Sequence, residues 1–126
     1  MHATIWFGAI AMMLTTAGHC LAQDAAAGEK VFVKCKACHV VDSDKNKIGP
    51  SLMGVIGRTA GTHEGFRYSK AMTEAGENGT VWDEETIGTY LRDPKGFIKG
   101  NRMAFAGLKS DEDVTNVIAY LKQFSE

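Results

Sequence analysis

Residues 34–41 read KCKACHVV, so Cys35 and Cys38 stand two residues apart and His39 directly follows the second cysteine. Three kinds of chemistry use such a cysteine pair. A disulfide oxidoreductase usually carries it after a strand in a βαβ pattern, and no such pattern is present here. A zinc site needs four ligands, commonly from two such pairs. The chain after residue 22 has no further cysteine and only one further histidine, His63.

Covalent haem attachment is the third chemistry, and it uses every residue of the motif. Each thiol adds to one vinyl group of the porphyrin, and the two-residue spacing lets both sulfurs reach the ring from one turn of chain. The adjacent imidazole then lies beneath the ring, where it can ligate the iron. The pattern therefore predicts one haem c attached at Cys35 and Cys38, with His39 as an iron ligand. A structural disulfide is the alternative, and it gives His39 no role.

The first 22 residues contain no Lys, Arg, Asp or Glu, so every charged residue lies in the remainder. An apolar run over about residues 3–14 is shorter than the roughly 20 residues of a membrane span, but it suits the core of a secretory signal peptide. We therefore expect residues 1–22 to be a signal peptide that is cleaved between Ala22 and Gln23, taking Cys20 with it, on export to the periplasm. An uncleaved N-terminal anchor is the alternative.

Residues 23–126 then form one small domain. Helical patterns cover residues 24–39, 83–93 and 110–124, with Ser110 as a predicted N-cap and Pro94 ending the second helix. A further stretch, residues 69–76, looks helical, and the glycine-rich segments between these patterns have no strand alternation. The sequence predicts a small all-α fold of three to five short helices, with long loops wrapped around one covalently bound haem. The formal net charge of −1 argues against a nucleic-acid binder.

A haem that only passes electrons needs a second axial ligand, whereas an open position suits gas binding or peroxide chemistry. The candidates are Met53, Met72, Met103 and His63. Met103 lies in GNRMAFAGL, residues 100–108, a predicted loop that can curve across one face of the ring. Met53 and Met72 lie in an apolar and a helix-like stretch, which suit packing better. Position in the chain favours Met103.

Several segments together resemble class I cytochrome c, most closely the branch of bacterial cytochrome c2 and mitochondrial cytochrome c. The resemblance runs from about Ala26 to Phe124. It is carried by GEKVFVKCKACH, IGPSLMGVIGR, GFRYS, WDEETIGTYLRDP, NRMAFAGL and VIAYLK. The resemblance implies the cytochrome c fold around one haem c, with His39 and Met103 as the two iron ligands.

The resemblance also assigns roles around the haem by position. Gly49 and Pro50 match the pair whose carbonyl accepts a hydrogen bond from the proximal imidazole. Arg58, Tyr68 and Trp82 match the polar groups that hold the inner haem propionate. These three residues are therefore expected to bind the cofactor through its carboxylate.

Two aromatic residues match positions on the side of the methionine ligand. Tyr90 matches the buried tyrosine near the ligand sulfur, and Phe105 matches the aromatic residue that shields the haem edge. Three further residues match the contact between the first and last helices: Gly28, Phe32 and Tyr120.

Some positions depart from the family pattern. Met72 occupies a place that is often Asn, and Asn101 and Arg102 replace the more usual Thr-Lys before the ligand. These departures concern the fine tuning of the site rather than its function.

The resemblance implies a soluble one-electron carrier, not an enzyme. We expect a monomer that takes electrons from a quinol-oxidising membrane complex and delivers them to a terminal oxidase or a photosynthetic reaction centre. We expect transient docking through basic residues that flank the haem edge, here called the lysine-rich face: Lys34, Lys36, Lys45, Lys47, Lys95, Lys99, Arg102 and Lys109. A haem enzyme or ligand-binding haem protein, such as a small peroxidase, is the alternative function.

Overall fold

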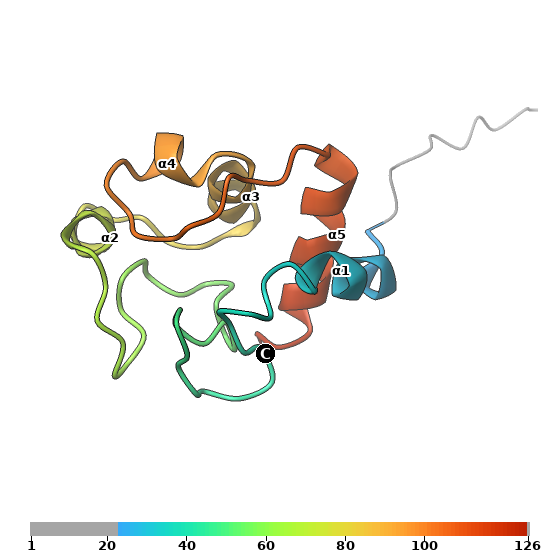
Figure 1. Ribbon diagram of the computed structural model, residues 1–126, viewed down its shortest axis with the longest axis horizontal. Helices are drawn as coiled ribbons and strands as arrows, with labels where there is room; N and C mark the ends of the chain where they lie inside the picture. The colour runs from blue at the N-terminus through green and yellow to red at the C-terminus, as the bar shows by residue number, and fades with distance from the viewer. Residues whose placement is uncertain (1–22, 126) are drawn as a thin grey trace, which may run out of the picture.

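The computed structural model describes residues 23–125, and this part of the chain contains five helices (Figure 1). They are α1 (Ala25–Phe32), α2 (Lys70–Glu77), α3 (Glu84–Arg92), α4 (Pro94–Phe97) and α5 (Asp111–Lys122). Strand-like pairing within these residues is limited to one isolated antiparallel bridge, between Thr59 and Val81. The predicted all-α fold with three to five short helices is therefore confirmed. The predicted signal peptide, residues 1–22, lies outside the described residues.

The helix starts follow from capping side chains. Asp83 caps α3 in a capping box with Thr86, in which each side chain accepts a hydrogen bond from the other residue's backbone N–H. Ser110 caps α5 by accepting from the Asp113 N–H. Acidic residues in the first turn of α3 and of α5 add favourable interactions with the helix dipole. Both predicted starts are confirmed. None of the five helices combines the length and the apolar character that a membrane span requires.

The first and last helices cross at close range. Phe32, which is 2% exposed, packs against Tyr120 with ring centroids 5.3 Å apart. At Gly28 a Cβ atom would lie only 1.9 Å from the backbone oxygen of Asn116, so only glycine allows this approach. The expected contact between Gly28, Phe32 and Tyr120 is present, and it joins the two ends of the described chain.

The helix predicted over residues 24–39 ends at Phe32, so this prediction was too long. After Phe32 the chain tightens into turns, in which the Lys34 and Cys35 N–H groups bond to carbonyls only three residues back. The His39 N–H then bonds to the Cys35 oxygen at 2.9 Å. The haem-attachment motif therefore lies in successive tight turns rather than on a regular helix.

Helix α4 was not predicted. Pro94 occupies its first position, where a missing N–H costs nothing, and the Asp93 side chain caps it by accepting from the Gly96 N–H. An Asp-Pro pair is both the end signal of α3 and the start signal of this single turn. Pro94 was interpreted only as the end of the preceding helix, and α4 was therefore not predicted.

The two long loops lie in different halves of the molecule in Figure 1. Residues 33–69 form the lower half, which contains the Cys-x-x-Cys-His motif. Helices α3 and α4 and the segment between α4 and α5, which contains Met103, form the upper half. Helices α1 and α5 close one side, and α2 lies at the other. His39 and Met103 therefore come from opposite halves of the fold.

Candidate functional site

His39 is held by the backbone of the segment that follows it. Its Nδ1 lies 2.7 Å from the Pro50 carbonyl oxygen. Because a carbonyl can only accept, Nδ1 carries the proton and Nε2 keeps its lone pair. A Cβ atom on Gly49 would lie 2.4 Å from the imidazole Cε1, so any larger residue there would displace the ring.

The surroundings of His39 favour the neutral form of its imidazole. Burial lowers its pKa, and the positive charges of Arg58 and Lys47 lower it further, against the opposing effect of the Pro50 hydrogen bond. A neutral imidazole with one nitrogen fixed by a carbonyl and the other free is the form that ligates metals. The local geometry therefore prepares His39 as a ligand.

Cys35 and Cys38 are both partly buried and form no disulfide with each other. Burial raises the pKa of the Cys35 thiol, Cys38 raises it further, and Lys34 opposes them. A disulfide oxidoreductase needs a lowered thiol pKa, so this environment does not favour thiol exchange. Among residues 23–125, no three His, Cys, Asp or Glu side chains gather as a metal-binding group. The zinc interpretation has no support in this geometry.

Met103 lies in the loop before α5 and packs partly buried against the hydrophobic core. The Tyr90 hydroxyl donates to its sulfur at 3.8 Å. Tyr90 is 8% exposed, and its ring packs against Trp82 with centroids 4.9 Å apart. Phe105, also partly buried, donates its N–H to the Met103 carbonyl at 3.0 Å. The expected neighbourhood of Met103, Tyr90 and Phe105 is thus assembled.

The other candidates for the second ligand are placed differently. Met53 is 38% exposed, so the expectation that it packs into the core is wrong. Met72 packs against the core from the first turn of α2. His63 is committed through both ring nitrogens, with Nδ1 3.0 Å from an Arg58 nitrogen and Nε2 3.2 Å from the Asp44 oxygen. Met103 remains the candidate whose sulfur accepts a hydrogen bond from a buried donor, the Tyr90 hydroxyl.

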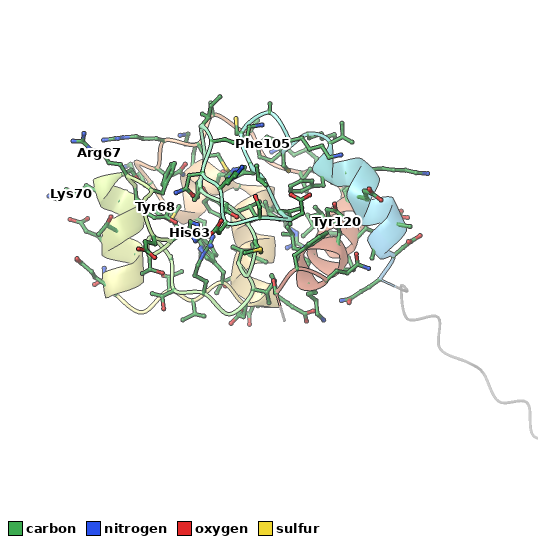
Figure 2. All side chains as sticks on the ribbon, turned by 90° about the horizontal axis from the view of Figure 1, so that it is seen from below. His63, Arg67, Tyr68, Lys70, Phe105 and Tyr120 are labelled. Carbon is green, nitrogen blue, oxygen red and sulfur yellow. The ribbon has the colours of Figure 1, made fainter. Side chains whose placement is uncertain are left out.

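Arg58 and Tyr68 both contact His63, which lies close to Tyr68 in Figure 2. Arg58 donates to the Ser51 oxygen at 2.9 Å, and burial lowers the pKa of its guanidinium. The Tyr68 hydroxyl accepts the His63 N–H at 3.1 Å. Two backbone hydrogen bonds align Trp82 beside Arg58: Trp82 N–H to the Arg58 oxygen and Gly57 N–H to the Trp82 oxygen.

The ring of Trp82 instead packs against Tyr90 and Phe97, with ring centroids 4.9 and 6.4 Å apart, so the side-chain contacts of this group come from Arg58, Tyr68 and His63. A phenolic hydroxyl and a cationic guanidinium that contact the same histidine suit a carboxylate. The group therefore fits a haem propionate.

Two features of the site were missed by the sequence reasoning. His63 was considered only as an iron ligand, whereas the structure places it against Arg58. Asn101 was identified only as a departure from the family pattern, yet its buried side chain makes three hydrogen bonds. A polar residue between two loop glycines gives no signal for such contacts, because they join segments that only the fold brings together.

Comparison with known proteins gives one consistent result. The cytochrome c family model matches residues 25–125. Cytochrome c2 of Afifella marina is 49% identical over 100 residues, covering 79% of this chain and 81% of the relative. Cytochrome c2 of Blastochloris viridis is 50% identical over 105 residues, covering 82% and 80%. The solved structure of cytochrome c2 from Rhodospirillum centenum superposes with a TM-score of 0.79 at 44% identity, covering 82% of this chain and 99% of that one.

Proposed function

This chain belongs to the cytochrome c family and carries a covalently bound haem c, and from that premise we propose that it is a one-electron carrier with its haem iron held between His39 and Met103. Cys35 and Cys38 provide the two thioether attachments. The protein works as an electron-transfer protein rather than as an enzyme.

One observation carries the assignment of the ligands. His39 and Met103 come from opposite halves of the fold. The Nε2 lone pair of His39 is free, and the Met103 sulfur accepts a hydrogen bond from a buried hydroxyl. Each is fixed by a different group, the Pro50 carbonyl for His39 and the Tyr90 hydroxyl for Met103. Two soft or borderline donors on opposite sides suit the two axial positions of a haem iron.

When bound, the haem supplies a one-electron Fe3+/Fe2+ couple. Ligation by Met and His raises its reduction potential relative to other ligand pairs. The chain holds both ligands in place before and after the electron moves, so neither residue has to leave or return. Arg58 would offset the charge of a haem propionate, and Tyr68 and Trp82 would donate hydrogen bonds to it, which would lower the cost of burying that charge.

We further propose that residues 1–22 direct export to the periplasm and are then removed. In that compartment the partners are a quinol-oxidising membrane complex as donor and a terminal oxidase or a photosynthetic reaction centre as acceptor. All eight residues of the lysine-rich face have exposed side chains. A basic face on a nearly neutral protein steers it to acidic docking patches and favours fast, short-lived complexes.

Salt dependence tests this docking. The electron-transfer rate to a purified membrane partner should fall steeply as salt is added, and Lys34→Gln should lower it at low salt. Lys122→Gln is the matched control, because the charge of Lys122 is already balanced by Glu84 at 2.5 Å. An electron-transfer rate that does not change with salt, or equal effects of the two substitutions on that rate, would rule out the lysine-rich face as the docking surface.

A carbon monoxide titration of the ferrous protein separates the carrier from a haem enzyme or ligand-binding haem protein. With both axial positions filled, we expect no binding at neutral pH and a reversible one-electron potentiometric titration. Ready binding of carbon monoxide would indicate an open position and would favour the alternative.

A further inference from the structure

Asn101 is a buried polar side chain in the loop that carries Met103. It is 5% exposed. Its Oδ1 accepts the Met103 backbone N–H at 2.9 Å, and its Nδ2 donates to the backbone oxygens of Pro94 at 2.7 Å and Ile98 at 2.8 Å. Because the N–H can only donate and the carbonyls can only accept, one orientation of the amide satisfies all three bonds.

These bonds connect Met103 to a well-packed part of the molecule. Pro94, the first residue of α4, is less than 2% exposed, and Ile98, directly after α4, is 6% exposed. The Lys95 ammonium also donates to the Asn101 backbone oxygen at 2.6 Å. The backbone before Met103 is thereby fixed to α4.

The rest of the loop has few other attachments. After Asn101, the next backbone hydrogen bond to a different element in the described chain is from the Leu108 N–H to the Leu91 oxygen, at 2.7 Å. Between these points the segment leaves α4 and runs toward α5 (Figure 1). The Tyr90 hydroxyl contacts the sulfur of Met103, and not the backbone. Asn101 is therefore the side chain that holds the backbone of Met103.

We propose that Asn101 is the positioning residue for the Met103 thioether, a role that rests on the proposed ligation of haem iron by Met103. Tyr90 orients the sulfur, and Asn101 fixes the main chain from which it extends. Met103 leaves the iron only when the three bonds of a buried amide are broken or strained together. Loss of this amide raises the population of the open loop, and an external ligand that competes with Met103 then binds more tightly.

Imidazole added to the ferric, haem-loaded protein measures that population. In Asn101→Ala the apparent Kd for imidazole should fall by about tenfold to a hundredfold, the range expected for the loss of two or three hydrogen bonds. Asn101→Ser keeps one donor and one acceptor and should give an intermediate Kd. If the alanine variant does not fold, the serine variant alone carries the test.

Asn116→Ala is the matched control. Asn116 in α5 is also 5% exposed, and its Oδ1 accepts the Asp24 N–H at 3.1 Å, far along the chain from Met103. This variant should have a lower free energy of unfolding but the wild-type Kd for imidazole. A merely structural role for Asn101 would make the two variants behave alike.

The outcomes separate this inference from the proposed function. The weak red-end absorption band of a methionine-ligated ferric haem reports the ligation itself. If wild-type protein has the band, but Asn101→Ala binds imidazole no more tightly than Asn116→Ala, the positioning role is overturned and the ligation stands. If wild-type protein lacks the band, the ligation fails, and the role of Asn101 fails with it.

Discussion

The Tyr90 hydroxyl lies in a buried position where its neutral form is strongly favoured. Burial raises the pKa of Tyr90 from 10.0 to about 12. Burial also raises the pKa of the two other tyrosines, Tyr68 and Tyr120. A protonated hydroxyl is what allows Tyr90 to donate to the Met103 sulfur, so the same burial that raises the pKa preserves this contact at physiological pH.

An ultraviolet titration of the tyrosines tests this environment. We expect Tyr90 to ionise only near pH 12, and Tyr90→Phe to lack this component. Since the folded-state pKa lies above the unfolded value, the stabilisation is complete below pH 10 and is lost as the pH rises from 10 to about 12. The free energy of unfolding should therefore decline more in wild type than in Tyr90→Phe across this range. Parallel curves would mean that Tyr90 is not buried as described.

Local residues of the site were predictable and distant contacts were not. The Cys35–Cys38–His39 pattern carries its chemistry within five consecutive residues, so spacing alone indicates it. Tyr90 precedes its Met103 partner by 13 residues, and only the family resemblance pointed to it. Neither the spacing of the residues nor the family resemblance predicted the contact between Arg58 and His63.

At the scale of elements, the contact between α1 and α5 depends on Gly28, which has no side chain to keep the two helices apart. In Gly28→Ala the added Cβ would meet the Asn116 oxygen at 1.9 Å and the Tyr120 Cβ at 2.9 Å. Backbone cannot yield as a flexible side chain does, so the two helices must separate. We expect a loss of about 3 kcal/mol or more in the free energy of unfolding, measured by guanidinium denaturation of the haem-loaded protein.

Gly88→Ala in α3 is the control. Its Cβ would meet only the end of the Arg92 side chain at 3.1 Å, and other atoms at ordinary contact distance. The higher helix propensity of alanine, worth about 1 kcal/mol, should make this change neutral or stabilising. Equal denaturation midpoints for the two variants would contradict the close crossing at Gly28.

Helix starts were more predictable than helix ends. The start of α3 at Asp83 and the N-cap of α5 at Ser110 were both predicted, because the side chain that caps a helix acts within three residues. The end of α1 at Phe32 was missed, since alanine- and lysine-rich sequence continues to favour a helix beyond it. The tight turns of residues 33–38 instead serve the placement of the cysteines and His39, which is a requirement of the whole fold.

At the scale of the whole molecule, the haem accounts for an architecture that the chain alone does not justify. Residues 33–69 contain no helix, and long loops are costly in a small domain unless they cover something. Burial of apolar surface contributes roughly 25 cal/mol per Å², so a large rigid porphyrin between the two halves would be a major source of stability. The cofactor is then part of the core rather than an addition to it.

A double variant, Cys35→Ala with Cys38→Ala, tests this dependence. Without thioether attachment the chain should retain little haem and be largely unfolded, with far-ultraviolet circular dichroism well below that of the haem-loaded wild type. Native helix content in the haem-free double variant would show that the five helices pack without the cofactor.

The central claim is that His39 and Met103 hold the two axial positions of one haem. The most direct test is the red-end absorption band of the ferric protein, recorded for wild type and for Met103→Leu. The account predicts a weak band in the wild type that disappears in Met103→Leu, while the haem stays covalently attached. A wild-type protein without the band, or a band that persists in Met103→Leu because another methionine is the ligand, would contradict it.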